Sequence, residues 1–286
     1  MLLLAAILCF DAMAVLVRVL SAHYTVLELS AYRNVFGVIP SLALMLWTGE
    51  LRFRGSNLRI TRWKVAISRG VVVALAQVFF YTAIARLELA TVSALSQTNA
   101  FFVVILAIVI LREHVGVWRW AAIAIGFVGA VWILRPGTDA FSIYALFPIG
   151  AALCYAYSMV TVRLFGPEVS SALLYLYTAV TAAIAAILLA MFTTSFSPIV
   201  SWVDVVLILA MAIVGGIAVL LLTLSYRLAQ PSILATFGYF GILTAFLWGW
   251  LFFGEAPLET LFPGVVLIVG AGVLIIWREN RARKMG

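Results

Sequence analysis

Residues 91–111 read TVSALSQTNAFFVVILAIVIL, and the last twelve of these residues are all apolar. A helix rises about 1.5 Å per residue, so a helix of this length reaches across the hydrocarbon core of a bilayer, which is about 30 Å thick. Hydrocarbon offers no hydrogen-bond partners, so a segment that crosses it must satisfy its own backbone groups as a helix. The stretch therefore predicts a membrane-spanning helix with a polar first half.

Similar apolar runs follow one another along the chain, separated by short polar segments. Of the 286 residues, 66% are hydrophobic and only 10% are charged, and the mean hydropathy is +1.19. A soluble domain is about 45–50% apolar and about 25% charged, so lipid must cover part of this chain's surface. We predict an all-α membrane protein with ten transmembrane helices, over residues 2–20, 28–48, 65–85, 91–111, 118–135, 142–162, 170–192, 203–226, 231–252 and 261–277.

The net charge of +7 is distributed unevenly between the loops on the two faces. Basic residues accumulate on the cytoplasmic side of membrane proteins. The loops of one face hold only Arg86 and Arg135. We therefore expect a multi-pass protein of the inner (plasma) membrane with both termini in the cytoplasm, on the face that carries thirteen basic residues: Arg52, Arg54, Arg59, Arg62, Lys64, Arg112, Arg119, Arg163, Arg227, Arg278, Arg281, Arg283 and Lys284.

The two halves of the chain share landmarks in the same order. Arg18 in the first span is matched by Arg163 directly after the sixth, at an offset of 145 residues. The acidic loop residue Glu113 is matched by Glu255, at the corresponding place later in each half. An ordered match of charged landmarks is not expected from chance similarity between apolar helices, so we interpret it as an internal duplication.

Five crossings in each half make the duplication an inverted one. Equivalent helices then run in opposite directions and are related by a pseudo-two-fold axis in the membrane plane. Inverted repeats of this kind are a transporter architecture, in which two packings of the halves expose one midplane site to either side. We therefore predict a five-helix repeat over residues 1–138 and a second, with a short basic tail, over residues 139–286.

Short motifs that occur twice carry a family resemblance. They are Arg86-Leu87 with the polar run to Ser96, Leu111-Arg112-Glu113 with Trp118-Arg119, and Gly126–Leu134, with the counterparts Arg227–Ser232, Gly254-Glu255 and Gly264–Ile276. Over nearly its whole length the chain resembles the drug/metabolite transporter superfamily, specifically the ten-helix members with two EamA domains. The polar stretch Ser96–Asn99 and the aromatic richness resemble the bacterial aromatic amino-acid exporter branch.

The resemblance implies a basket of helices and efflux from the cytoplasm. The third, fourth, eighth and ninth helices, with the first and sixth, would enclose a central cavity, and the fifth and tenth would support it from outside. Several members carry proline near the position of Asn99, and this chain does not. Any break of its fourth helix must therefore arise differently.

Polar groups inside the spans are costly and usually face a cavity or a partner helix. The spacing of Gln77 and Tyr81 places both on one face of the third span, and the fourth span carries a dense polar cluster. Interhelical hydrogen bonding and a packing tyrosine are the alternatives. We predict a substrate site formed by Gln77, Tyr81, Ser93, Ser96, Gln97, Asn99, Tyr155, Ser158, Thr223 and Tyr239.

Few charged groups lie within the spans. Asp11 is a carboxylate deep in the first span, where it could meet a substrate ammonium, carry a proton for coupling, or serve a structural contact. Arg33 and Arg69 lie near helix ends, and we expect them to extend to the lipid headgroups. The stripes of small residues Ala122/Gly126/Ala130 and Ala182/Ala186/Ala190 indicate helix packing.

Amides, hydroxyls and aromatic rings suit a neutral or zwitterionic substrate with an apolar part. We predict a secondary transporter that exports such metabolites, in particular aromatic amino acids, by alternating access at a midplane cavity. The alternatives are a general drug or cationic-metabolite exporter, or a non-transport receptor or chaperone. His23 and His114 fall in loops on opposite faces, so we expect no metal site and no enzymatic activity. We also expect no cofactor and no nucleic-acid partner, and a monomer surrounded by lipid.

Overall fold

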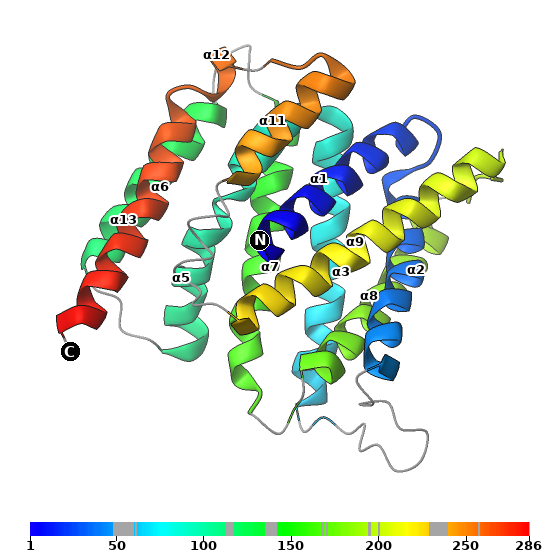
Figure 1. The fold of residues 1–286 in the computed structure, drawn as a ribbon, viewed down its shortest axis with the longest axis horizontal. Helices are drawn as coiled ribbons and strands as arrows, with labels where there is room; N and C mark the ends of the chain where they lie inside the picture. Colours follow the sequence, from blue (N-terminus) through cyan, green and yellow to red (C-terminus); the bar gives the residue numbers. More distant parts are fainter. Residues whose placement is uncertain are drawn as a thin grey trace.

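The computed structural model of the chain describes all residues except 48–59, 61, 113–116, 135–141, 167–168, 170, 194–195, 200, 229–239, 257 and 286. Every regular element among the described residues is helical, which confirms the predicted all-α class (Figure 1). The helices are α1 (Leu2–Leu20), α2 (Val26–Trp47), α3 (Trp63–Arg86), α4 (Leu89–Ser96), α5 (Asn99–Leu111), α6 (Val117–Leu134), α7 (Leu146–Thr161), α8 (Ser171–Thr193), α9 (Trp202–Leu228), α11 (Phe240–Phe253), α12 (Leu258–Leu261) and α13 (Gly264–Met285).

The helices lie where hydropathy places the predicted spans, with ends that differ by a few residues. Six described segments are long and apolar enough to cross a membrane. The ninth predicted span, 231–252, is described only from Phe240 onwards, as α11. The count of ten crossings therefore stays a prediction, while the helical membrane fold is confirmed.

Large apolar side chains cover the outside of the bundle. Val109, Phe127, Phe192 and Leu251, from four different helices, are all largely exposed. Water would meet a continuous apolar surface at these positions, whereas hydrocarbon accepts it without cost. The exposed side chains fit a protein that is surrounded by lipid.

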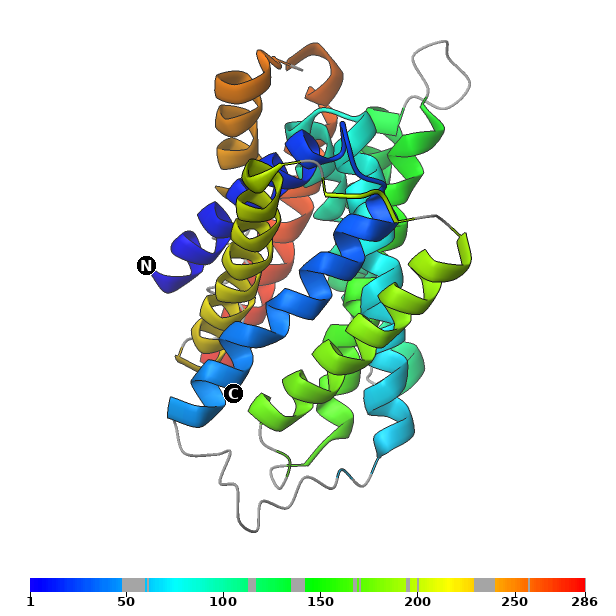
Figure 2. The ribbon, with the colours of Figure 1, turned by 90° about the vertical axis from the view of Figure 1, so that its right-hand side faces the viewer.

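The helices pack in pairs that come from opposite halves of the chain. Helix α1 packs against α9 and α11, and helix α7 packs against α3 and α5. Helix α2 contacts α9 and α8 contacts α3, while α2 and α8 contact each other, as Figure 2 shows. Helices α6 and α13 form a pair at one edge of the molecule (Figure 1).

Small residues let these helices approach closely. A Cβ atom added to Gly129 of α6 would lie 2.7 Å from the carbonyl oxygen of Gly264 in α13. The alanine stripe of α8 packs as expected, because Ala182, Ala186 and Ala190 are buried against α2 and α3. These contacts hold the scaffold around the buried polar groups described next.

Candidate functional site

The predicted fourth span is broken into two helices at its polar cluster. Gln97 N–H donates to Ala94 O (3.2 Å) and Thr98 N–H donates to Leu95 O (3.1 Å), so the backbone tightens to the i→i−3 pattern of a 3₁₀ turn. The Thr98 hydroxyl also donates to Leu95 O (2.6 Å). Side-chain hydrogen bonds of this kind compete with regular helix and bend it. Leu89–Leu111 remains one segment long enough to cross the membrane, and the break within it arises without proline.

The polar residues around the break do not form one surface. Ser96 donates its hydroxyl to its own backbone, at Val92 O (2.7 Å). Asn99 donates its amide to Ala152 O of α7 (2.9 Å), and Ser93 lies beside Gly241 of α11. The break is therefore anchored to α7, while the residues before it face α11.

Gln77 is part of a buried hydrogen-bond network between α2 and α3. Its Oε1 accepts from the Asn34 amide and from the Ser30 hydroxyl (3.3 Å), and the Asn34 amide also donates to Ser30 O (2.9 Å). All three residues are almost completely buried. In this structure Gln77 contributes to the contact between two helices. Interhelical hydrogen bonding of this kind was the alternative to a substrate-binding role.

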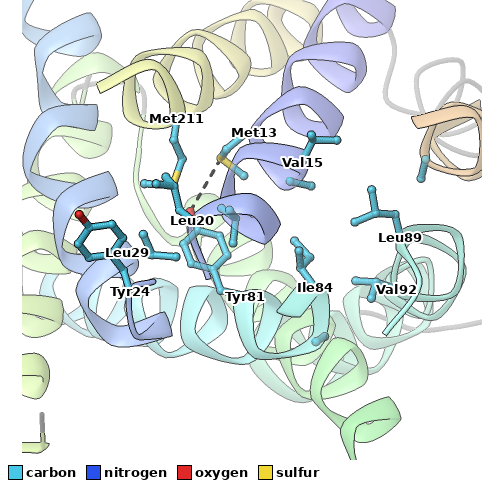
Figure 3. Close-up of a cluster of buried hydrophobic side chains, with 14 of the residues drawn as sticks. Met13, Val15, Leu20, Tyr24, Leu29, Tyr81, Ile84, Leu89, Val92 and Met211 are labelled. Atoms are coloured by element: carbon cyan, nitrogen blue, oxygen red, sulfur yellow. Dashed lines mark hydrogen bonds between the residues drawn. The ribbon is translucent and has the colours of Figure 1, made fainter. Parts of the chain in front are cut away.

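Tyr81 belongs to a large hydrophobic cluster that joins α1, α2, α3 and α9. Its side chain is 1% exposed, and its hydroxyl donates to the sulfur of Met13 at 3.9 Å, as Figure 3 shows. Leu29 and Met211 lie in the same cluster. Tyr81 therefore packs as a core residue with its polar end turned towards α1.

Arg33 of α2 lies near the polar end of Tyr81 and near two further tyrosines. It interacts electrostatically with Tyr81, with Tyr155 of α7 and with Tyr175 of α8. Arg33, Tyr155 and Tyr175 are surrounded by the helices and yet keep accessible surface. These three side chains are therefore enclosed by the bundle without being fully buried.

Arg69 is also inside the bundle, although its guanidinium serves a different contact. It is 6% exposed and donates to Ser158 O and to the hydroxyl of Thr161 (3.0 Å), both on α7. The expectation that Arg33 and Arg69 extend to the headgroups was wrong, because neighbouring helices cover both side chains. Ser158 therefore takes part in a link between α3 and α7 through its carbonyl oxygen.

The remaining predicted site residues lie apart from the arginine–tyrosine group or outside the description. Asp11 is half-buried, interacts with the Thr244 side chain of α11, and has one carboxylate oxygen without a hydrogen-bond partner. Gln97 is half-buried at the break. Thr223 lies on α9, but its side chain is outside the described part of the structure, as is Tyr239 as a whole.

A second polar group joins α1, α4 and α11 at one end of the bundle. Arg18 forms an ion pair with Glu255, donates to Leu87 O (3.0 Å), and lies over the ring of Phe253 (4.5 Å to the ring centre). Glu255 also accepts from the N–H of Leu89 (3.0 Å). Sequence reasoning did not find this contact, although both charged residues were landmarks of the internal duplication.

Glu88 lies next to this ion pair, in the turn between α3 and α4. Burial and the nearby charge of Glu255 raise the pKa of Glu88 above the usual glutamate value. Thr91 donates a hydrogen bond to the Glu88 carboxylate (3.3 Å), which opposes the shift in part. One guanidinium is thus paired with Glu255 at this end of the molecule, while Glu88 lies near the pair without an ion-pair contact among the described residues.

Comparison with known proteins places the chain in a transporter family. Residues 1–135 match the EamA-like transporter family. A riboflavin transporter of Rhizobium johnstonii is 33% identical over 76% of this chain and 72% of its own length. A pseudopaline exporter of Pseudomonas aeruginosa is 27% identical over 93% of this chain and 91% of its own length.

A solved crystal structure shows the same fold. It is 20% identical, covers 98% of this chain and 97% of its own, and superposes with a TM-score of 0.67. The helical membrane fold, the family match and the relatives agree with one another. The chain belongs to the EamA-like transporter family, and it is a multi-pass membrane transporter of small metabolites.

Proposed function

We propose that this transporter exports small zwitterionic metabolites with an aromatic part, in particular aromatic amino acids. The observation that carries the proposal is that Tyr155 of α7 and Tyr175 of α8 both lie near Arg33 inside the bundle and both keep accessible surface. Tyrosines offer rings for stacking and hydroxyls for hydrogen bonds at low entropic cost. The break beside Asn99 adds irregular backbone at the depth where transporters bind substrate.

Alternating access between two inverted repeats, over residues 1–138 and 139–286, is the proposed mechanism. The helix contacts support it, since exchanging each helix with its proposed counterpart turns observed pairs into other observed pairs. The α1–α9 pair becomes α7–α3, the α2–α9 pair becomes α8–α3, and the α1–α11 pair becomes α7–α5. Two such halves can rock about a shared site, because the contacts of one half in the outward-open state can be those of the other half in the inward-open state.

Export is the direction that the family resemblance implies, and the basic loops support the orientation that it needs. Thirteen Lys and Arg residues on the side of both termini favour a cytoplasmic location for that side. A reporter fused within residues 20–27 is expected to lie outside the cytoplasm, and one at position 55 inside it. The opposite pattern would remove the basis for export. The proposed working unit is a monomer.

Riboflavin is a second candidate substrate, because one relative is named as a riboflavin transporter. Its ring system is planar and uncharged, so Tyr155 and Tyr175 could stack on it equally well. The cation of Arg33 among these tyrosines argues against the remaining alternative, an exporter of cationic drugs. Like charges repel in a site of low dielectric.

Transport by purified protein in liposomes tests the proposal. Uptake of labelled tryptophan and phenylalanine should be saturable, and each should compete with the other, while a quaternary ammonium compound should not compete. Saturable uptake of riboflavin without competition by tryptophan would favour the second candidate. Uptake no faster than in empty liposomes for every solute would contradict carrier function.

A further inference from the structure

Arg33 carries a buried charge whose partners do not account for it. Its Nη1 donates to the amide oxygen of Asn34 (3.3 Å), whereas its Nε has no hydrogen-bond partner. Among the described residues, no carboxylate lies within ion-pair distance of Arg33. The ion pair that the described residues form joins Arg18 to Glu255. An ionised group taken from water without a partner costs far more than one hydrogen bond returns.

Part of the Arg33 side chain stays accessible between its neighbouring helices. Its Nε is covered on the side of α9, because an added Cβ atom at Gly215 would lie 3.5 Å from Nε. Three tyrosines interact electrostatically with the Arg33 guanidinium. Two of them, Tyr155 and Tyr175, keep accessible surface. The site therefore combines one planar cation, aromatic rings and hydroxyl groups.

We infer that Arg33 binds the carboxylate of the transported substrate while the rings of Tyr155 and Tyr175 contact its aromatic part. A guanidinium offers paired N–H donors that match the two oxygens of a carboxylate. A bound carboxylate would accept from the Nη groups and neutralise the buried charge, while Nε stays covered by the protein. Helix α2, which the sequence did not assign to the site, thereby contributes its specificity-determining residue. The inference rests on the proposed function for its biological meaning.

Arg69 provides a matched internal control. It is also an arginine inside the bundle whose Nε has no partner, but it is only 6% exposed and its Nη1 donates two hydrogen bonds to α7. Its partners, Ser158 and Thr161, are groups of the protein itself and link α3 to α7. A substitution of Arg69 should therefore change stability, and a substitution of Arg33 should change ligand selectivity.

The test compares the affinities of tryptophan and tryptophanamide, which differ in whether they carry a carboxylate, for folded protein in detergent. Arg33→Gln should reduce the affinity for tryptophan about tenfold or more and should not reduce that for the amide, whose ammonium no longer meets a like charge. Arg33→Lys keeps the charge but loses the paired N–H donors of the guanidinium. Its loss of tryptophan affinity should therefore be smaller than that of Arg33→Gln. Arg69→Gln should keep the wild-type ratio of the two affinities even if it unfolds at lower temperature.

The ratio of affinities in one sample does not depend on the folded fraction, so a poorly folding variant still gives an answer. A ratio in Arg33→Gln equal to that of the wild type would overturn the assignment. A wild-type protein with no preference for tryptophan over its amide would overturn it too, even if riboflavin were transported. Wild-type selectivity without transport in liposomes would instead contradict the proposed function and leave the carboxylate site standing.

Discussion

Arg18 and Glu255 form an ion pair that joins the last turn of α1 to the residues directly after α11. Each partner also holds the turn that leads into α4, Arg18 through Leu87 O and Glu255 through the N–H of Leu89. Three helices that border the middle of the bundle are thus tied together at one end. A carrier that alternates between two faces must separate contacts of this kind when that end opens.

Breaking this ion pair should open that end of the molecule. In a background with Cys9 and Cys154 replaced by serine, a cysteine at Ala90, a buried residue next to the Leu89 that Glu255 holds, serves as the probe. Arg18→Gln should raise its rate of labelling by a membrane-impermeant thiol reagent about tenfold or more. The measurement is the labelling rate in intact proteoliposomes.

The two partners should also be energetically coupled. Arg18→Gln, Glu255→Gln and the double variant form a cycle, for which we expect a coupling of about 0.5–3 kcal/mol in thermal or denaturant unfolding. Exchanging the charges should restore little, because an arginine at position 255 cannot accept from Leu89 N–H. Additive single effects would show that the pair contributes nothing.

Glu88 makes the stability of the same end depend on pH. Its raised pKa means that the folded protein holds the proton more tightly than the unfolded chain does. Stability should therefore fall as the pH rises from the usual glutamate value through the higher folded value. Glu88→Gln should raise the unfolding temperature at pH 7, and the gain should shrink towards pH 4. A gain that is constant over this range would contradict the assignment to Glu88.

Positions of helices could be predicted from the sequence because long apolar segments have few alternatives in lipid. The break after Ser96 could not, since it depends on which backbone oxygens Thr98 and its neighbours choose as hydrogen-bond partners. The dense polar cluster was a signal that the helix is irregular there. It gave no information about which neighbouring helix each side chain meets.

The site was predictable in its residue types but not in its charges. Tyr81 and Tyr155 were expected to lie together, and both interact with Arg33. Arg33 itself was assigned to the headgroups because distance from a helix end does not tell whether another helix covers the side chain. Tyr175 was missed for the same reason, as the seventh span had no assigned role beyond packing.

The α6–α13 pair offers a prediction about the scaffold. Gly129→Ala would place a methyl group 2.7 Å from Gly264 O, so the helices must separate. We expect destabilisation of about 1–3 kcal/mol, measured as a lower unfolding temperature in detergent. Gly270→Ala on α13 is the matched control, because nothing lies within 4 Å of its added Cβ atom. An equal loss in both variants would show that helix packing is not the cause.

Transport by aromatic-site variants separates packing from substrate contact. Tyr81→Ala would leave a cavity in the core and should lower folded yield, so Tyr81→Phe, which removes only the hydroxyl bonded to Met13, is the informative change. Its transport should stay within about threefold of wild type.

Tyr155→Ala removes a half-buried ring. The lost aromatic contact with the substrate is worth roughly 1 kcal/mol or more, so the KM for tryptophan should rise about fivefold or more with folded yield retained.

Asn99→Ala leaves Ala152 O at the broken helix without its donor. This change should lower the maximal transport rate more than it raises KM. Wild-type kinetics in Tyr155→Ala and Asn99→Ala would place the substrate elsewhere in the bundle.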